Sequence, residues 1–112
     1  MSDDLEKKLL AGAAYRIFFD ELKKHVAATR TVFDGELADD NLKEAMGRFH
    51  TIRGGAGFFK FSMISELAGK LECALQDSTT EQVALRREEL QAFNEALAKE
   101  ADKLPPPAVP AG

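Results

Sequence analysis

The feature that most constrains the fold is a glycine-rich connection between two stretches of helical periodicity, within residues 50–72 of this 112-residue chain. Glycines occupy positions 54, 55 and 57, and a new helical pattern begins just after Phe61. If the chain folds back around Phe61, His50 and Glu72 each lie eleven residues from the turn. At 1.5 Å of rise per residue, both then lie about 16 Å along their helices, at the same level. The sequence therefore predicts a helical hairpin that pairs a histidine with a carboxylate.

The composition outside this connection is typical of an all-α protein. Ala, Leu, Glu and Lys dominate, β-branched residues are sparse, and strand-type alternation is absent. We expect a first helix that begins after Ser2 and runs towards Thr31, followed by a break at Gly35. A second helix is expected to begin at Asp39 or Asp40 and to fray through the glycines that follow position 53.

Two further helices are predicted in the second half of the chain. Ser62 is expected to cap the third helix, and a capping box of Ser-Thr-Thr-Glu at residues 78–81 is expected to open the fourth. Three prolines at 105–107 end that helix. Four amphipathic helices with short connections fold most simply as an antiparallel four-helix bundle. We therefore predict one helical domain over residues 1–104 and a proline-rich linker or tail over residues 105–112.

Charge and composition argue against several classes of function. The net charge of -4 disfavours nucleic acid or an anionic membrane as the main partner. No apolar run is long enough to span a bilayer, and the first residues lack the pattern of a signal peptide. The single cysteine, Cys73, precludes an internal disulfide and fits a reducing cytoplasm. Two histidines and one cysteine are too few for a structural zinc site, so we expect no bound metal.

The candidate site is the set of residues around His50, because neutral imidazole is a good nucleophile near neutral pH. A hydrogen bond from one ring nitrogen to Glu72 would leave the other lone pair aimed outward and would stabilise the developing positive charge. Arg53, one turn on, can offer a cationic donor to phosphoryl oxygens. Gly54 and Gly57 each cost about 1 kcal/mol against alanine in a helix, which suggests that they clear space for a partner's active site. The combination favours receiving and passing on a phosphoryl group.

Taken singly, these residues have simpler interpretations. A histidine at the edge of a helical stripe is most often only solvated, and glycines near a helix end are most often a C-terminal cap. Phe58, Phe59 and Phe61 are expected to plug the end of the bundle, with exposure of one of them for docking as the alternative. His25 stands among lysines on the first helix and is interpreted as a surface residue. The combination and spacing around His50 favour the functional interpretation.

Residues 50–61 read His-Thr-Ile-Arg-Gly-Gly-Ala-Gly-Phe-Phe-Lys-Phe, and this segment closely resembles the motif of histidine phosphotransfer domains. The resemblance is in particular to the N-terminal phosphotransfer domain of CheA-type chemotaxis kinases, whose motif runs His-Ser-Ile-Lys-Gly-Gly-Ala-Gly-Thr-Phe-Gly-Phe. Residues 15–21, Tyr-Arg-Ile-Phe-Phe-Asp-Glu, also resemble the aromatic-rich part of that family's first helix. The resemblance covers most of residues 10–104 and implies a four-helix phosphotransfer fold.

The resemblance also implies a role for each candidate residue. His50 would be the phosphorylated histidine, and Glu72 matches the glutamate that bonds to its ring. Arg53 stands where the family usually has lysine, which keeps the positive charge for the phosphoryl group. Gly54 and Gly57 match the small residues beside the site, where a partner gains access.

Two departures from the family pattern bear on kinase specificity and rate. Gly69 stands where chemotaxis kinases often place a second histidine in the hydrogen-bond network of the site. Lys60 replaces a glycine near the turn that connects the two helices. Neither change removes the nucleophile or its carboxylate.

By this resemblance, the chain is a phosphorelay carrier in two-component chemotaxis signalling. The ATP-binding domain of a CheA-type histidine kinase would phosphorylate His50, which would pass the group to an aspartate of a CheY-like response-regulator receiver domain. The chain needs no cofactor of its own, because ATP would be bound by the kinase domain and magnesium by the partner domains. It would be a substrate and carrier rather than a kinase by itself. The expected location is the cytoplasm, with a chemoreceptor cluster as one place within it.

The alternative is a non-catalytic helical interaction module with a degenerate phosphotransfer site. Gly69 and Lys60 are the features that favour it. A small histidine-dependent hydrolase is disfavoured, because no serine or cysteine nucleophile is positioned with His50 and a second base.

Overall fold

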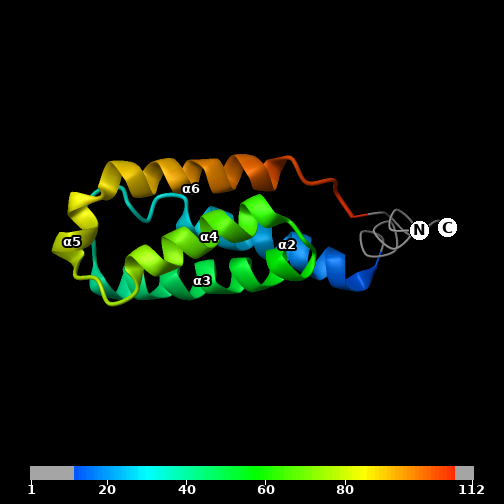
Figure 1. Ribbon diagram of the computed structural model, residues 1–112, viewed down its shortest axis with the longest axis horizontal. Coiled ribbons are helices and arrows are strands. Elements are labelled where there is room, and N and C mark those ends of the chain that lie inside the picture. The colour runs from blue at the N-terminus through cyan, green and yellow to red at the C-terminus, as the bar shows by residue number, and fades with distance from the viewer. Residues whose placement is uncertain (1–11, 108–112) are drawn as a thin grey trace.

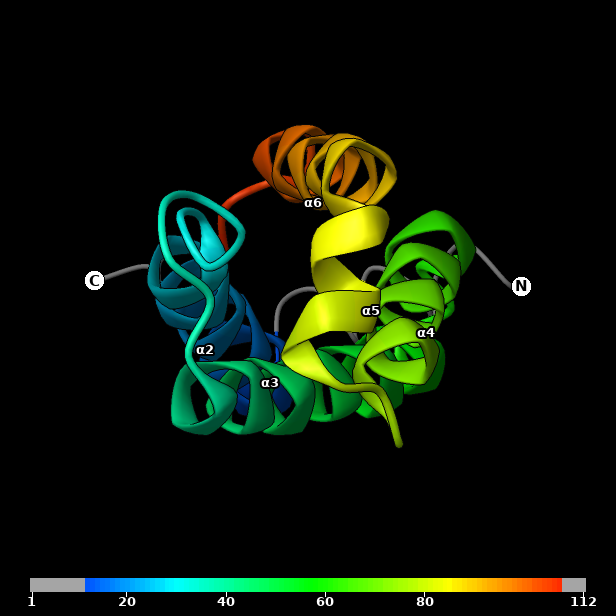
Figure 2. The same cartoon turned by 90° about the vertical axis from the view of Figure 1, so that its left-hand side faces the viewer.

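The computed structural model describes residues 12–107, and this part of the chain is all-helical, as predicted. It contains five helices: α2 (Ala13–Thr29), α3 (Asp39–Phe58), α4 (Ser62–Leu75), α5 (Thr80–Leu85) and α6 (Arg87–Asp102). The four long helices run alternately up and down an elongated body of 51 × 26 × 19 Å (Figure 1). Seen end-on in Figure 2, they stand in a ring in the order α2, α3, α4, α6, with α5 across one end. The predicted antiparallel bundle is therefore confirmed.

The centre of the ring is filled by the apolar stripes of the four long helices. The core residues without exposed surface include Phe49 of α3, Leu71 of α4, and Leu90 and Leu97 of α6. Leu22 of α2 packs into the same cluster. Each such side chain contributes about 1.5–3 kcal/mol when it is buried, so this core holds the two helices of the site together. None of the helices within residues 12–107 combines the length and the apolarity needed to cross a membrane.

The connection between α3 and α4 is a tight C-terminal cap rather than a frayed end, because α3 stays helical through its glycines to Phe58. The Phe61 N–H donates to the Ala56 carbonyl at 2.8 Å, and the Lys60 N–H donates to the Gly57 carbonyl at 3.1 Å. This bond pair is the Schellman motif, which normally places glycine at the left-handed position. Here that position is Lys60, with φ of 64°.

An aromatic cluster covers the end of the bundle beside this turn. Tyr15, Phe18, Phe59 and Phe61 lie with ring centroids 5.1–6.3 Å apart. Tyr15 is fully buried, and its hydroxyl donates to the Pro105 carbonyl at 2.5 Å. Two of the three predicted plugs are thus confirmed. Phe58 is 66% exposed instead, which is the alternative that the sequence left open.

The boundaries of the predicted helices need correction at three places in the second half of the chain. The fourth helix is broken at Arg86, whose φ of -108° and ψ of 13° separate α5 from α6. Because α5 crosses the end of the bundle and buries Val83 there, it cannot share the axis of α6. The capping box is formed by Thr79 and Gln82, one residue later than predicted. Ser62 does not cap α4, because it is already the first helical residue.

The expected start of the first helix at Ser2 lies outside the described residues. In the described part, α2 begins at Ala13 and ends at Thr29, two residues before the predicted end. The second helix begins at Asp39, as predicted. The loop between α2 and α3 is held to α6, because the Arg87 guanidinium donates to the Gly35 carbonyl at 2.8 Å.

Candidate functional site

The antiparallel pairing of α3 and α4 brings His50 and Glu72 together, as the spacing predicted. His50 Nδ1 lies 2.6 Å from Glu72 Oε2. Since a carboxylate only accepts hydrogen bonds, Nδ1 carries the proton and donates it, and the lone pair resides on Nε2. The His50 side chain is 63% exposed, whereas that of Glu72 is 16% exposed. An accessible imidazole is therefore held in one tautomer by a mostly covered carboxylate.

Arg53 completes the group by contacting both of these residues. Its Nε lies 3.1 Å from Glu72 Oε1, and its Nη2 lies 3.3 Å from His50 Nδ1. Because Nδ1 already donates its proton to Glu72, the approach of Nη2 to it is a close contact of two donors rather than a hydrogen bond. Oε1 is buried, and no described residue bonds to it in hydrogen-bond geometry. The ion pair with Arg53 is what compensates that oxygen.

The glycines of α3 differ in what surrounds them. A Cβ atom at Gly54 would have no described atom within 4 Å, and one at Gly57 would make only an ordinary contact of 3.6 Å with Ser65 Oγ. Packing thus leaves both positions open beside the site. Gly55 was not singled out by the sequence, yet a Cβ there would lie 2.8 Å from Phe18 Cδ1. That glycine lets α2 pack closely against α3.

The chain matches the Hpt domain family over residues 13–103, from the first residue of α2 to just past the end of α6. It belongs to the Hpt domain family. The match confirms the predicted Hpt family, whereas the likeness to CheA-type domains stays a prediction. An Hpt domain is a phosphotransfer carrier of two-component signalling and interacts with histidine kinases and response regulators. Searches of curated proteins and of solved structures found no match to the chain.

The second histidine of this Hpt domain, His25, is not the surface residue that the sequence predicted. Its side chain is 15% exposed and lies where α2 meets α3. His25 Nδ1 accepts a hydrogen bond from Arg48 Nη1 at 3.1 Å, and its Nε2 lies 4.0 Å from Glu21 Oε2. Burial and then the positive Arg48 lower the pKa of His25, against a smaller opposing effect of Glu21. The lysines that precede His25 in the sequence do not indicate this contact, because Arg48 belongs to another helix, α3.

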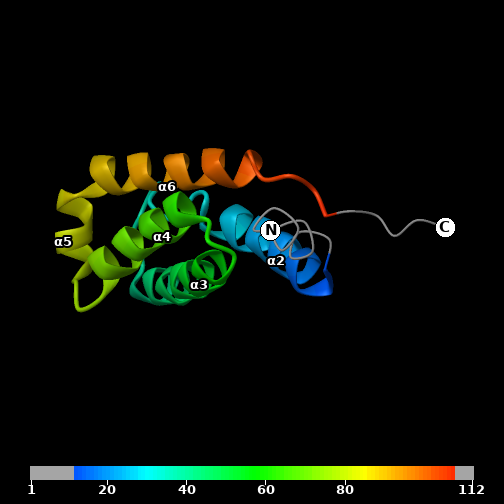
Figure 3. The ribbon, with the colours of Figure 1, turned by 45° about the vertical axis from the view of Figure 1, so that its right-hand side comes forward.

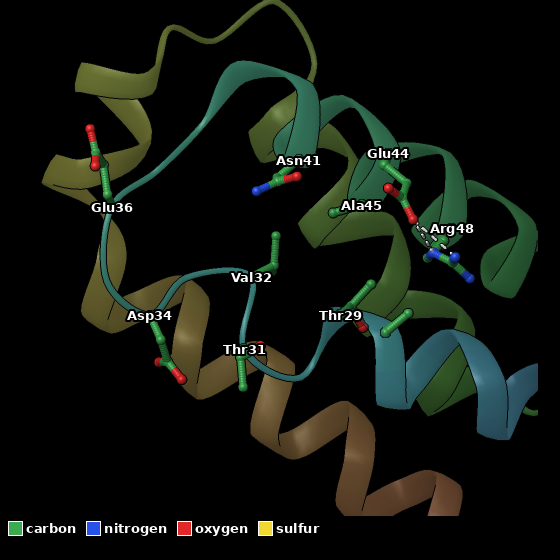
Figure 4. Close-up of a pocket in the computed structure, with 10 residues that line it drawn as sticks. Thr29, Thr31, Val32, Asp34, Glu36, Asn41, Glu44, Ala45 and Arg48 are labelled. Atoms are coloured by element: carbon green, nitrogen blue, oxygen red, sulfur yellow. Dashed lines mark hydrogen bonds and ion pairs between the residues drawn. The ribbon is translucent and has the colours of Figure 1, made fainter.

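The pocket drawn in Figure 4 is separate from the His50 group in the Hpt domain. It has a volume of about 240 Å³ and lies where the loop after α2 meets the start of α3. Its lining includes Glu44 and Arg48, which form an ion pair of 2.9 Å. His50, Arg53 and Glu72 do not line it. The candidate site lies instead on the surface of α3 and α4, where the His50 and Arg53 side chains are exposed. Within residues 12–107, no three or more His, Cys, Asp or Glu side chains are grouped to hold a metal ion.

Proposed function

We propose that His50 is the residue of this Hpt domain that carries the phosphoryl group. The observation that supports this most is the 2.6 Å contact between Nδ1 of an exposed imidazole and Oε2 of a covered carboxylate. This contact leaves Nε2 as the nucleophilic nitrogen, on the part of the ring that a partner can reach.

The proposed reaction has two transfers at the same nitrogen. In the first, the Nε2 lone pair attacks the γ-phosphorus of ATP bound to a separate kinase domain, and the bond to the leaving ADP oxygen breaks. The positive charge that develops on the ring is stabilised by Glu72, and the phosphoryl oxygens gain a cation in Arg53. In the second, an aspartate oxygen of a receiver attacks phosphorus, and the electrons of the N–P bond return to Nε2.

The donor and acceptor that we propose are a CheA-type kinase domain and CheY-like receivers. The support is the likeness of residues 50–61 to the chemotaxis motif. ATP would come with the kinase domain and magnesium with the partner domains, and the reaction would take place in the cytoplasm, with a receptor cluster as a candidate position. We also propose residues 1–104 as the working domain and 105–112 as a linker or tail.

The test is incorporation of phosphate from labelled ATP in the presence of a CheA-type catalytic core. His50→Gln should abolish labelling with helical content unchanged, and His25→Gln is the matched control that should label like the wild type. The product should be acid-labile and base-stable, as phosphohistidine is. Retained labelling of His50→Gln would refute the assignment. A folded wild type that no candidate kinase labels would favour the interaction module instead.

A second variant tests the carboxylate. Glu72→Ala should slow labelling by roughly ten- to hundredfold without abolishing it, because the ring loses its fixed tautomer and orientation but keeps its nucleophile. Circular dichroism should show the same helical content as the wild type. An unchanged rate would remove Glu72 from the reaction.

A further inference from the structure

The structure places one more residue, Gly69, directly beside the group formed by His50, Arg53 and Glu72. Gly69 lies in α4, one turn before Glu72, and α4 lies along α3 in both Figure 1 and Figure 3. A Cβ atom at Gly69 would lie 3.3 Å from Arg53 Cδ and 3.9 Å from Arg53 Cγ. The aliphatic stem of Arg53 therefore lies so close to this position that a Cβ there would be in tight contact with it.

Arg53 uses this space to cross from α3 to α4. A long cationic side chain on a helix surface loses rotamer entropy when it is held in one geometry. A favourable contact must offset that cost, and the side chain needs open space in which to extend. The partner is Glu72, whose Oε1 lies 3.1 Å from Arg53 Nε. The route passes over Gly69.

Other helical glycines do not have this relation to the site. Cβ atoms at Gly47 and Gly54 would meet no described atom within 4 Å, and the contact at Gly57 is an ordinary one. The backbone at Gly69 is helical and has no positive φ, so its conformation does not call for glycine. Glycine disfavours the helix interior relative to alanine. The neighbour that would have to give way is the stem of Arg53.

We propose that Gly69 is a positioning residue for the phosphoryl site. Its missing side chain lets the Arg53 guanidinium rest on Glu72 Oε1, and this contact in turn keeps Oε2 aimed at His50 Nδ1. The proposal deepens, and rests on, the proposed function of His50. Because Oε1 is buried and compensated only by this ion pair among the described residues, a displacement of Arg53 by a few tenths of an ångström weakens the compensation of a covered charge. The carboxylate would then hold the ring less firmly in its orientation.

A double-mutant cycle of Gly69→Ala and Arg53→Ala tests the proposal. The rate is that of His50 phosphorylation by potassium phosphoramidate, a small donor that needs no docked partner, followed by phosphorus NMR. Gly69→Ala should lower the rate about three- to tenfold, since a displacement of a few tenths of an ångström costs less than the hundredfold of a 1 Å error. In the Arg53→Ala background the same change should have no effect. Gly47→Ala, another helical glycine near His50 with open space around it, is the matched control.

A second readout follows the guanidinium itself. In nitrogen–proton correlation spectra, the Arg53 Nε–H should be protected from exchange in the wild type and in Gly47→Ala, and should lose that protection in Gly69→Ala. Loss of Nε–H protection in Gly69→Ala but not in Gly47→Ala would not come from a loss of helix stability, because alanine preserves or raises the stability of a helix relative to glycine.

Two results would overturn the proposal: an equal loss of rate in both backgrounds, or an unchanged rate with an unchanged Nε–H signal in Gly69→Ala. The spectra do not depend on phosphorylation. If the wild type took no phosphoryl group but Gly69→Ala still released the Nε–H, the proposed function would fail while the positioning of Arg53 by Gly69 would stand.

Discussion

Lys60→Gly should stabilise the domain, because Lys60 occupies a backbone conformation that suits glycine. Its φ of 64° lies in the left-handed region, at the position that closes the turn between α3 and α4. The two backbone hydrogen bonds of that turn use the Phe61 and Lys60 N–H groups, and glycine would keep both. The substitution therefore removes a Cβ clash without removing a contact that holds the turn.

The expected gain is the difference between two effects. A residue with a Cβ pays about 1–2 kcal/mol to adopt the left-handed conformation. Glycine escapes that cost but has more conformations to lose on folding, which costs about 0.4–1 kcal/mol. The middle values of the two ranges give a net stabilisation of about 0.8 kcal/mol. For a domain of this size, that corresponds to a rise in Tm of roughly 3–6 °C.

Urea unfolding followed by far-ultraviolet circular dichroism measures the change as a shift in midpoint at constant slope. Lys60→Ala is the control, because it removes the ammonium group but keeps the Cβ, and it should give no gain. Asp77→Gly, at φ of 57°, should gain less than Lys60→Gly, because aspartate tolerates this conformation better than lysine. If Lys60→Ala stabilises as much as Lys60→Gly, the backbone argument is wrong and the lysine charge is responsible.

Three further predictions concern α3 and its contact with α2. Gly54→Ala should raise the free energy of unfolding, measured in urea, by about 1 kcal/mol, because the new methyl group meets no packed neighbour within 4 Å. The same variant should slow labelling by the kinase core. An unchanged labelling rate would show that the position does not face the partner. Gly55→Ala should not share this gain, because the overlap with Phe18 costs about 1–3 kcal/mol; equal midpoints for the two variants would contradict that close packing. The pKa of His25 is lowered in the folded state, so the unfolded chain binds the proton first as pH falls. The stability that the neutral His25 contributes is therefore fully present above pH 6.5, the ordinary pKa of histidine, and is lost as pH falls below that value. His25→Gln should therefore flatten the dependence of the urea midpoint on pH in that range, and an unaltered slope would assign the dependence to other groups.

The pairing at the centre of the site could be predicted because it depends on local quantities. Helical rise and the position of the turn at Phe61 fix which residue of α4 stands level with His50, and the answer was Glu72. The role of Arg53 in compensating Glu72 Oε1 could not be predicted in the same way, because it depends on the path of a long side chain over α4.

The remaining differences come from contacts between elements that are distant in the sequence. Gly54 and Gly55 are adjacent and identical in type, and only the packing of α2 decides that one is open and the other tightly covered. His25 is partly buried between α2 and α3, and its partner Arg48 lies on the other helix. No glycine or proline marks the break at Arg86 in the sequence. The break arises because α5 crosses the end of the bundle.

The position of His50 in the middle of α3 has a kinetic consequence for the proposed transfer. A single ring nitrogen is free, and Glu72 holds the other one from the side of α4. If His50 carries the phosphoryl group as proposed, its donor and its acceptor must approach this one nitrogen in turn. Transfer through such a carrier would follow ping-pong kinetics. An excess of unphosphorylated receiver would then compete with the kinase domain and slow the recharging of the carrier that it depends on.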